Sequence, residues 1–204
     1  MLHAVHNDTI IWQSFKAGDR TSFEKIYQLY FKNLYEYGMR LLNNSDLVKD
    51  NIHDLFVKIW MNKSNLGEVT NVKSYLLVSL RGAIYNNNAK NKKPAISIEE
   101  LDEGYYFKMD FSVENEFIRK DNFSDEKQKL LALMNSLSPR QKEVIYLKYF
   151  EELSYDEIAS IMHISVKATY KLSARALDSL RQILNVSNVS LFILIALGRL
   201  PSLS

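Results

Sequence analysis

Two successive helix start signals near the carboxy-terminal end constrain the fold of this chain most. The first consists of four residues at the positions of a hydrophobic staple and a capping box: Leu153, Ser154, Glu157 and Ile158. It predicts a short helix that reaches about Met162, after which Ser165 caps a longer helix that reaches about Leu184. A short helix, a tight turn and a second helix form a helix-turn-helix motif.

The second helix of this motif carries cations on one side. Lys167, Lys171 and Arg175 recur at four-residue spacing, with Tyr170 and Ala174 between them. A rigid helix of this kind can enter the major groove of duplex DNA, where Lys and Arg bind phosphates and guanine edges. The alternative for an isolated helix is an ordinary solvated basic face. The capped helix and the tight turn before it favour DNA binding.

Helical periodicity also dominates the rest of the chain. Only 6 Gly and 3 Pro occur in 204 residues, which leaves little turn material for a many-stranded sheet. In the amino-terminal part we predict a short helix capped by Asp8 and stopped by Gly18, a long helix from Asp19 to Leu41, a helix over residues 45–60, and a helix from Val72 that Pro94 ends. In the carboxy-terminal part we predict a helix over residues 127–137 and a helix capped by Ser138, with Pro139 and Gln141 after it. The fold class is therefore all-α.

In the helix over residues 45–60 the apolar and charged residues separate onto different faces. The residues that we expect to face inward are Val48, Ile52, Leu55, Phe56 and Ile59. The charged residues at four-residue spacing on another face are Asp50, Asp54 and Lys58. In the long helix before it, aromatic and aliphatic residues from Phe23 through Tyr27 to Leu41 recur at helical spacing, which is typical of core packing.

Charge divides the chain into three parts. Residues 1–93 have a net charge of +5, residues 94–126 of −7 and residues 127–204 of +4. Periodicity is weak in the acidic part, which we interpret as a linker. The sequence thus predicts a helical domain over 1–93, a linker over 94–126, a second helical domain over 127–185 and an apolar tail over 186–204. Two basic modules flanking a solvated linker are typical of nucleic-acid-binding proteins, with plain surface charge as the alternative.

The sequence contains no candidate residues for several kinds of catalytic or metal site. The chain has no Cys, no phosphate-binding glycine loop and no histidine pair at metal-ligand spacing on a helix with a Glu between the two. His3 and His6 could bind a metal weakly, but an untethered tail is the favoured interpretation of that segment. The serines at 138, 154 and 165 are better explained as helix caps than as nucleophiles. We therefore expect no enzyme activity, no metal, no cofactor and no small-molecule substrate. The first eight residues do not read as a secretory signal, and the apolar run 191–197 is too short for a membrane span. The expected location is the cytoplasm.

The helix that begins at Val72 has a polar face without acids. One stripe contains Gly82, Asn86, Lys90 and Lys93, and the adjoining one contains Arg81, Tyr85, Asn88 and Lys92. Amides, an aromatic ring and cations thus share one face of this predicted helix.

Motifs in three places carry a resemblance to a known family. The first group consists of Ala17–Asp19, Ser22-Phe23, Ile26-Tyr27, Tyr30 and residues 50–60. The second group consists of Tyr75-Leu76, Arg81 and Asn86. The third group consists of residues 137–141, 153–159 and 164–167, with Tyr170-Lys171 and Arg175–Leu177. In this order and spacing, over residues 15–93 and 125–184, the chain resembles the extracytoplasmic-function (ECF) subgroup of bacterial RNA polymerase sigma factors.

The resemblance implies a region-two helical bundle and a region-four helix-turn-helix domain. It also implies a protein without catalytic activity that binds core RNA polymerase, directs it to promoter DNA and is controlled by an anti-sigma factor. The residues it assigns to polymerase binding are Asp50, His53, Asp54, Phe56, Lys58 and Trp60.

The same resemblance assigns two groups of residues to promoter DNA. Residues 63–73 would form a loop that captures a flipped base of the minus-ten element. The minus-ten residues are Lys63, Asn65, Arg81, Tyr85, Asn86, Lys90 and Lys92. The minus-thirty-five residues are Ser165, Lys167, Tyr170, Lys171, Ala174 and Arg175.

The chain departs from the family pattern at three positions. His53 stands where Gln is frequent, Gly82 stands where Asn is frequent, and Thr169 places a hydroxyl where a methyl is usual. Gly82 lacks an amide for the flipped base and weakens the helix by about 1 kcal/mol relative to Ala. Thr169 predicts looser packing under the recognition helix.

Three alternatives stay open at this stage. The rival function is a stand-alone helix-turn-helix regulator that binds an operator without polymerase. The acidic linker either enters the polymerase's RNA channel, as the resemblance implies, or is a plain tether. The apolar tail either docks on a partner or is buried within the chain.

Overall fold

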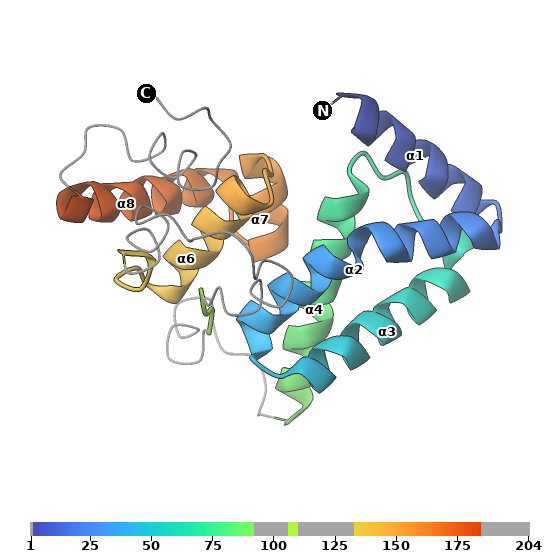
Figure 1. Ribbon diagram of the computed structural model, residues 1–204, viewed down its shortest axis with the longest axis horizontal. Helices are drawn as coiled ribbons and strands as arrows, with labels where there is room; N and C mark the ends of the chain where they lie inside the picture. Colours follow the sequence, from blue (N-terminus) through green and yellow to red (C-terminus); the bar gives the residue numbers. More distant parts are fainter. Residues whose placement is uncertain (1, 92–105, 110–132, 185–204) are drawn as a thin grey trace, which may run out of the picture. The chain divides into compact units, whose positions relative to one another are not determined.

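The computed structural model describes residues 2–91, 106–109 and 133–184 (Figure 1). The chain divides into two compact units, Met1–Glu100 and Leu101–Ser204, and their boundary falls inside the segment predicted as a linker. All regular secondary structure in the described residues is helical, which confirms the predicted fold class. In those same residues, no helix has the length and apolar character that crossing a lipid bilayer requires.

The first unit is a bundle of four α-helices around α2. Its elements are α1 (Leu2–Lys16), α2 (Arg20–Leu42), α3 (Ser45–Met61), the short 3₁₀ turn η1 (Lys63–Asn65) and α4 (Val72–Asn91). Helix α2 packs against α1, α3 and α4, so it forms the centre of the bundle (Figure 1). Helix α1 also packs against η1 and α4.

The connection between α1 and α2 forms as the sequence predicts. Gly18 has φ +100°, a left-handed conformation that glycine adopts without strain, and it ends α1. The carboxylate of Asp19 then accepts hydrogen bonds from the backbone N–H groups of Thr21 (3.2 Å) and Ser22 (2.9 Å). Hydrogen bonds from Ser22 hold the pKa of Asp19 below its usual value. Asp19 is thus the N-cap of α2.

The predicted start of the first helix at Asp8 is wrong. Helix α1 begins at Leu2, so Asp8 lies inside it. The Tyr30 hydroxyl on α2 donates a hydrogen bond to the Asp8 carboxylate. Burial of Tyr30, together with this hydrogen bond, raises the pKa of the phenol above its usual value. Asp8 therefore joins two helices, a role that the local sequence does not distinguish from that of a cap.

The predicted core of the first unit is largely confirmed. The inward-facing residues of α3, all buried, are Val48, Ile52, Leu55, Phe56 and Ile59. Trp12 and Phe15 of α1 are fully buried, and the Trp12 ring lies edge-on to that of Tyr75, with 5.2 Å between centroids. Tyr27 differs from the prediction, because it is 37% exposed at the edge of the α2 stripe.

The second unit contains the helix-turn-helix motif. Its elements are α6 (Pro139–Ile145), the π-helical segment η4 (Tyr146–Phe150), α7 (Tyr155–Met162) and α8 (Val166–Leu184). Ser138 with Gln141, and Ser154 with Glu157, form the two predicted capping boxes. Helices α6 and α7 both pack against α8 (Figure 1).

The turn between α7 and α8 also has the predicted form. His163 adopts a left-handed conformation with φ 54°, and its N–H donates to the carbonyl of Ala159, which ends α7. The Ser165 hydroxyl then accepts a hydrogen bond from the backbone N–H of Ala168 at 3.1 Å. Ser165 therefore caps α8, and the two caps fix where α7 ends and α8 begins.

The π-helical segment before α7 was not predicted. The buried Tyr146 hydroxyl donates to the Glu151 carboxylate at 2.7 Å, and the Lys148 ammonium donates to the carbonyl of Leu153 at 3.1 Å. Phe107 packs on Tyr146 with 5.7 Å between ring centroids, and Phe107 is buried together with Met109. Phe107 and Met109, which lie in the predicted linker, are thus buried, and Phe107 packs on the helix-turn-helix unit.

Several predictions fall wholly or mostly outside the described residues. They concern the rest of the acidic segment, Pro94, the tail over 186–204 and most of the helix over 127–137. Of that helix, residues 133–137 are described. Residues 133 and 134 are helical, whereas the chain turns over 135–137, so the predicted helix ends earlier than Leu137. Met134 and Leu137 are buried.

A close approach between α2 and α3 depends on Gly38. A Cβ atom built on Gly38 would lie 2.8 Å from Cγ1 of Val48, closer than carbon atoms approach without displacement. Both residues are buried, so the surrounding helices leave little room for such a displacement.

We expect Gly38→Ala to lower the free energy of unfolding of this unit by about 1 kcal/mol, because overpacking outweighs the gain in helix propensity. Both tryptophans of the chain, Trp12 and Trp60, lie in this unit, so denaturant unfolding followed by tryptophan fluorescence reports on it alone. In a Val48→Ala background the same substitution should become neutral or stabilising. A stabilising effect in the unmodified chain would contradict the close approach.

Candidate functional site

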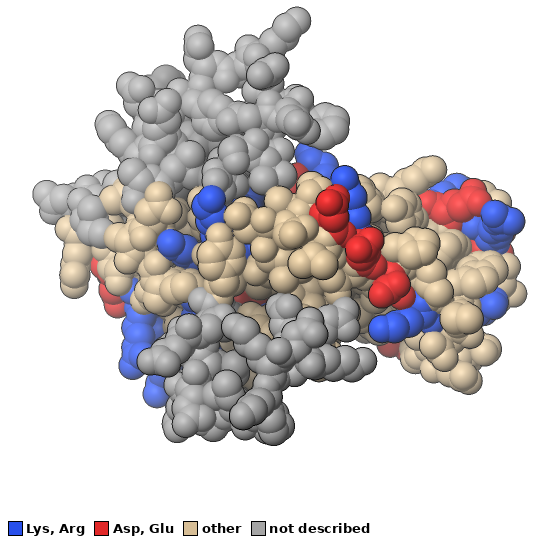
Figure 2. Space-filling model, turned by 90° about the horizontal axis from the view of Figure 1, so that it is seen from below, with Lys and Arg blue, Asp and Glu red and all other residues tan. Residues whose placement is uncertain are grey.

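Helix α3 presents a charged face to solvent. Asp50, His53, Asp54 and Lys58, four of the six residues predicted to bind polymerase, are exposed on it. Burial of the opposite, apolar face against α2 fixes this orientation. Figure 2 shows a short row of acidic side chains bordered by lysine and arginine side chains on one face of the protein. A charged face of this kind suits an electrostatically matched protein partner.

Phe56 does not lie on this face. It is 3% exposed, and its ring packs on those of Phe23 and Tyr27, with centroids 5.8 and 4.9 Å apart. Trp60 is half-buried, and its ring centroid lies 5.0 Å from that of Phe23. The apolar spacing of α3 turns Phe56 toward the core, so its predicted contact with polymerase stays a prediction that the burial of its ring does not favour. The rings of Phe56 and Trp60 both pack against Phe23 of α2. The predicted role of Trp60 in polymerase binding stays a prediction.

Three exposed apolar residues of α3 were missed by the sequence analysis. Leu47, Val57 and Met61 are 49%, 40% and 75% exposed. Leu47 is three residues before Asp50 and Val57 three residues after Asp54, and Met61 follows Val57 by four, so they share the charged face. This spacing was the available signal. Apolar groups surrounded by charged ones are typical of a protein-binding surface.

The segment between α3 and α4 is held at both ends. Lys63 lies with its ammonium 4.5 Å from the Trp60 ring centroid and donates to the Trp60 carbonyl. At the other end, the Asn71 side chain accepts a hydrogen bond from the N–H of Ser74 at 3.1 Å and caps α4. Asn65 is exposed between them. The predicted base-capturing loop is thus an ordered segment with an exposed amide.

The polar face of α4 differs in part from the prediction. Arg81 is only 6% exposed, and its guanidinium lies 4.5 Å from the centroid of the half-buried Tyr85 ring. Asn86 is exposed. Arg81 therefore packs on Tyr85, whereas its position on the polar face of the helix alone predicts a side chain in solvent. The side chain of Lys90, and Lys92 as a whole, lie outside the described residues.

Helix α8 presents all its predicted minus-thirty-five residues to solvent. The exposed residues are Ser165, Lys167, Tyr170, Lys171, Ala174 and Arg175. Ala176 and Leu180 on the opposite side are fully buried. The DNA-binding role of these residues stays a prediction, and their arrangement has the form that groove binding requires: a rigid helix with cations on its outer side.

Tyr155 of α7 supports this face and was not singled out by the sequence analysis. Its ring packs on that of Tyr170 with 4.1 Å between centroids, and its hydroxyl lies 3.2 Å from that of Ser173. The ammonium of Lys148 lies 4.8 Å from the Tyr155 ring. No local pattern marks Tyr155, because its partners lie on a different helix.

The buried hydroxyl of Thr169 has a hydrogen-bond partner. Thr169 is fully buried, and its hydroxyl donates to the carbonyl of Ser165 at 3.1 Å. A buried polar group that is hydrogen-bonded carries little of the cost of an unsatisfied one. The expected reason for looser packing under α8 is therefore removed at this position.

Among the residues that the structure describes, no group of three or more His, Asp or Glu side chains lies close enough together to hold a metal ion.

Comparison with known proteins identifies relatives of this chain. Residues 127–180 match the family model of Sigma-70, region 4. The RNA polymerase sigma factor YlaC of Bacillus subtilis (strain 168) is 24% identical over 143 residues, which cover 70% of this chain and 80% of that protein.

Two solved structures share the fold. One is CnrH in complex with the cytosolic domain of CnrY, with a TM-score of 0.56, 16% identity and coverage of 89% of this chain and 99% of that one. The other is the sigma factor RpoE in complex with the anti-sigma factor NepR from Bartonella quintana, with a TM-score of 0.56, 20% identity and coverage of 81% and 98%. The region 4 match and the similarity to YlaC support the resemblance to bacterial sigma factors. The two solved structures show that the chain shares their fold.

Gly82 has open space around it. A Cβ atom built there meets no atom within 4 Å, so a side chain fits on this part of α4 without displacement. We expect Gly82→Ala to raise the free energy of unfolding of the first unit by about 1 kcal/mol, the usual difference in helix propensity. Denaturant unfolding followed by tryptophan fluorescence measures it. Gly38→Ala is the matched control of opposite sign, and a destabilising Gly82→Ala would contradict the open site.

Proposed function

We propose that this protein is an alternative sigma factor that binds core RNA polymerase and directs it to specific promoters. The observation that carries the proposal is the exposed basic face of α8 in a capped helix-turn-helix, within the residues that match Sigma-70 region 4. The similarity to a named RNA polymerase sigma factor over 70% of the chain supports it.

In this proposal the first unit binds polymerase and the minus-ten element, and the second unit binds the minus-thirty-five element. The exposed face of α3, with Asp50 and Asp54 among apolar neighbours, binds the polymerase. The segment before α4 and the exposed amides of Asn65 and Asn86 bind bases of the melted minus-ten element. Helix α8 binds the minus-thirty-five element as duplex through Lys167, and through further cations on the same face.

An anti-sigma factor controls the protein in this proposal. Two proteins of the same fold were solved with a bound partner, and one of those partners is named as an anti-sigma factor. We further propose that the chain has no catalytic activity of its own, because RNA synthesis belongs to the polymerase, and that it acts in the cytoplasm with that enzyme.

The second candidate function is a stand-alone helix-turn-helix regulator. The basic face of α8 would serve such a protein equally well. The exposed mixture of apolar and acidic residues on α3 favours the sigma factor, because operator binding gives that face no partner. Polymerase binding is thus the property that separates the two functions.

We expect Asp54→Arg to abolish binding to core polymerase while the fold stays intact, because a docking carboxylate becomes a like charge against a basic polymerase surface. Binding of a labelled chain to core polymerase measures this. Glu24→Arg, at an exposed carboxylate of α2 whose ion pair with Arg20 is on the surface, is the matched control. Normal affinity of the Asp54 variant would count against the proposed role of α3.

We expect Lys171→Ala and Arg175→Ala each to lower promoter binding by the holoenzyme about tenfold and to weaken its salt dependence, because each removes a cation from the DNA-facing side of α8. Affinity for core polymerase should not change. Arg181→Ala is the matched control, because Arg181 already pairs with Asp178 at 2.7 Å on the last turns of α8. Equal losses in all three variants would contradict groove binding by this face.

A further inference from the structure

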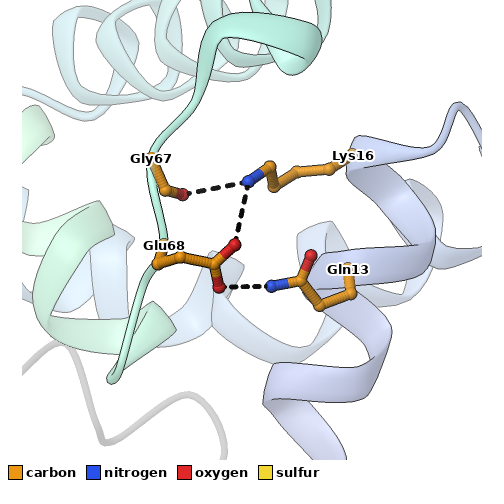
Figure 3. Close-up of polar contacts among 4 residues, drawn as sticks. All are labelled: Gln13, Lys16, Gly67 and Glu68. Carbon is orange, nitrogen blue, oxygen red and sulfur yellow. Dashed lines mark hydrogen bonds and ion pairs between the residues drawn. The ribbon is translucent and has the colours of Figure 1, made fainter.

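The segment between α3 and α4 is tied to the first helix at its middle. Figure 3 shows the side chains of Gln13 and Lys16, from the last turns of α1, pointing at Gly67 and Glu68. The Gln13 amide donates to the Glu68 carboxylate at 2.7 Å, and the Lys16 ammonium donates to the Gly67 carbonyl at 3.3 Å. The Lys16 ammonium also lies 3.6 Å from the other carboxylate oxygen of Glu68.

These contacts join residues that are far apart in sequence. Their separations are 55 residues for Gln13 and Glu68 and 51 residues for Lys16 and Gly67. With Lys63 at the start of the segment and Asn71 at its end, they form a third point of attachment. Helix α1 therefore helps to position the middle of the segment.

The ion pair has an electrostatic consequence. Glu68 is the only acidic residue between Asn62 and Asn71, so it supplies the one negative charge of the segment. The Lys16 side chain is 18% exposed and that of Glu68 is 79% exposed, so the ammonium is held against the protein while the carboxylate reaches back to it. A nearby DNA strand would be repelled by an unpaired carboxylate, and Lys16 offsets that charge.

We propose that Gln13 and Lys16 are positioning residues for minus-ten recognition, holding the base-binding segment in shape and neutralising Glu68. This inference rests on the proposed function. An exposed ion pair adds little to the stability of a protein, so its loss should change the loop more than the fold. The contacts of Gln13 and Lys16 with Gly67 and Glu68 can thus set how much open complex forms and which minus-ten bases are preferred.

The test uses the full chain with core polymerase on a promoter found by run-off transcription, and on versions with each of the four bases at every minus-ten position. We expect Lys16→Ala and Gln13→Ala each to lower open-complex formation about threefold to tenfold and to flatten the base preference. Affinity for core polymerase and the thermal unfolding midpoint should stay unchanged. Lys16→Arg should restore the wild-type profile, because a guanidinium can make the same contacts.

Two controls separate positioning from direct contact with DNA. Lys25→Ala removes an exposed cation of α2 and should leave the base preference unchanged. In a Glu68→Ala background, Lys16→Ala should cause a smaller further loss than in the unmodified chain, because only the hydrogen bond to the Gly67 carbonyl is left to remove. Additive losses would show that Lys16 binds phosphate directly and would overturn the inference.

The result also distinguishes this inference from the function on which it rests. If the unmodified chain gives no promoter-specific transcription, the proposed function fails. If it does so and the Lys16 and Gln13 variants keep both its strength and its base preference, the sigma factor stands and the positioning role is overturned.

Discussion

Burial of the apolar face of α3 against α2 determines what the first unit presents to its surroundings. The close approach at Gly38 and Val48 fixes the separation of the two helices, and Val48 begins the row of buried residues along α3. Because that row faces inward, Asp50 and Asp54 must face outward. The candidate polymerase surface is therefore a direct consequence of how the core packs.

The second unit depends on helix caps in the same way. The capping box of Ser154 and Glu157 sets where α7 begins, and His163 and Ser165 set where it ends and α8 starts. The burial of Ala176 and Leu180 then determines which side of α8 faces the core. The cations then lie together on the outer side.

Features decided by neighbouring residues could be predicted from the sequence, whereas features decided by distant ones could not. Both capping boxes, the Asp19 cap and the buried stripe of α3 follow from patterns within a few residues. Asp8 was misread because its partner, Tyr30, lies on another helix.

The same distinction holds for the candidate sites. Arg81 occupies a polar helical position, but its packing on Tyr85 withdraws it from solvent. Phe56 belongs to a recognisable motif and yet lies in the core. The tie between Lys16 and Glu68 leaves no local trace in the sequence, because it is made only when α1 folds back on the segment before α4.

Run-off transcription tests the central claim most directly. Core polymerase would transcribe pooled genomic fragments of the source organism with and without this protein, and the transcript starts would be sequenced. If the protein is a sigma factor, we expect discrete new transcript starts that share two upstream motifs at a fixed spacing. Absence of new starts, while the protein alone still binds DNA fragments, would contradict the account and favour a stand-alone regulator.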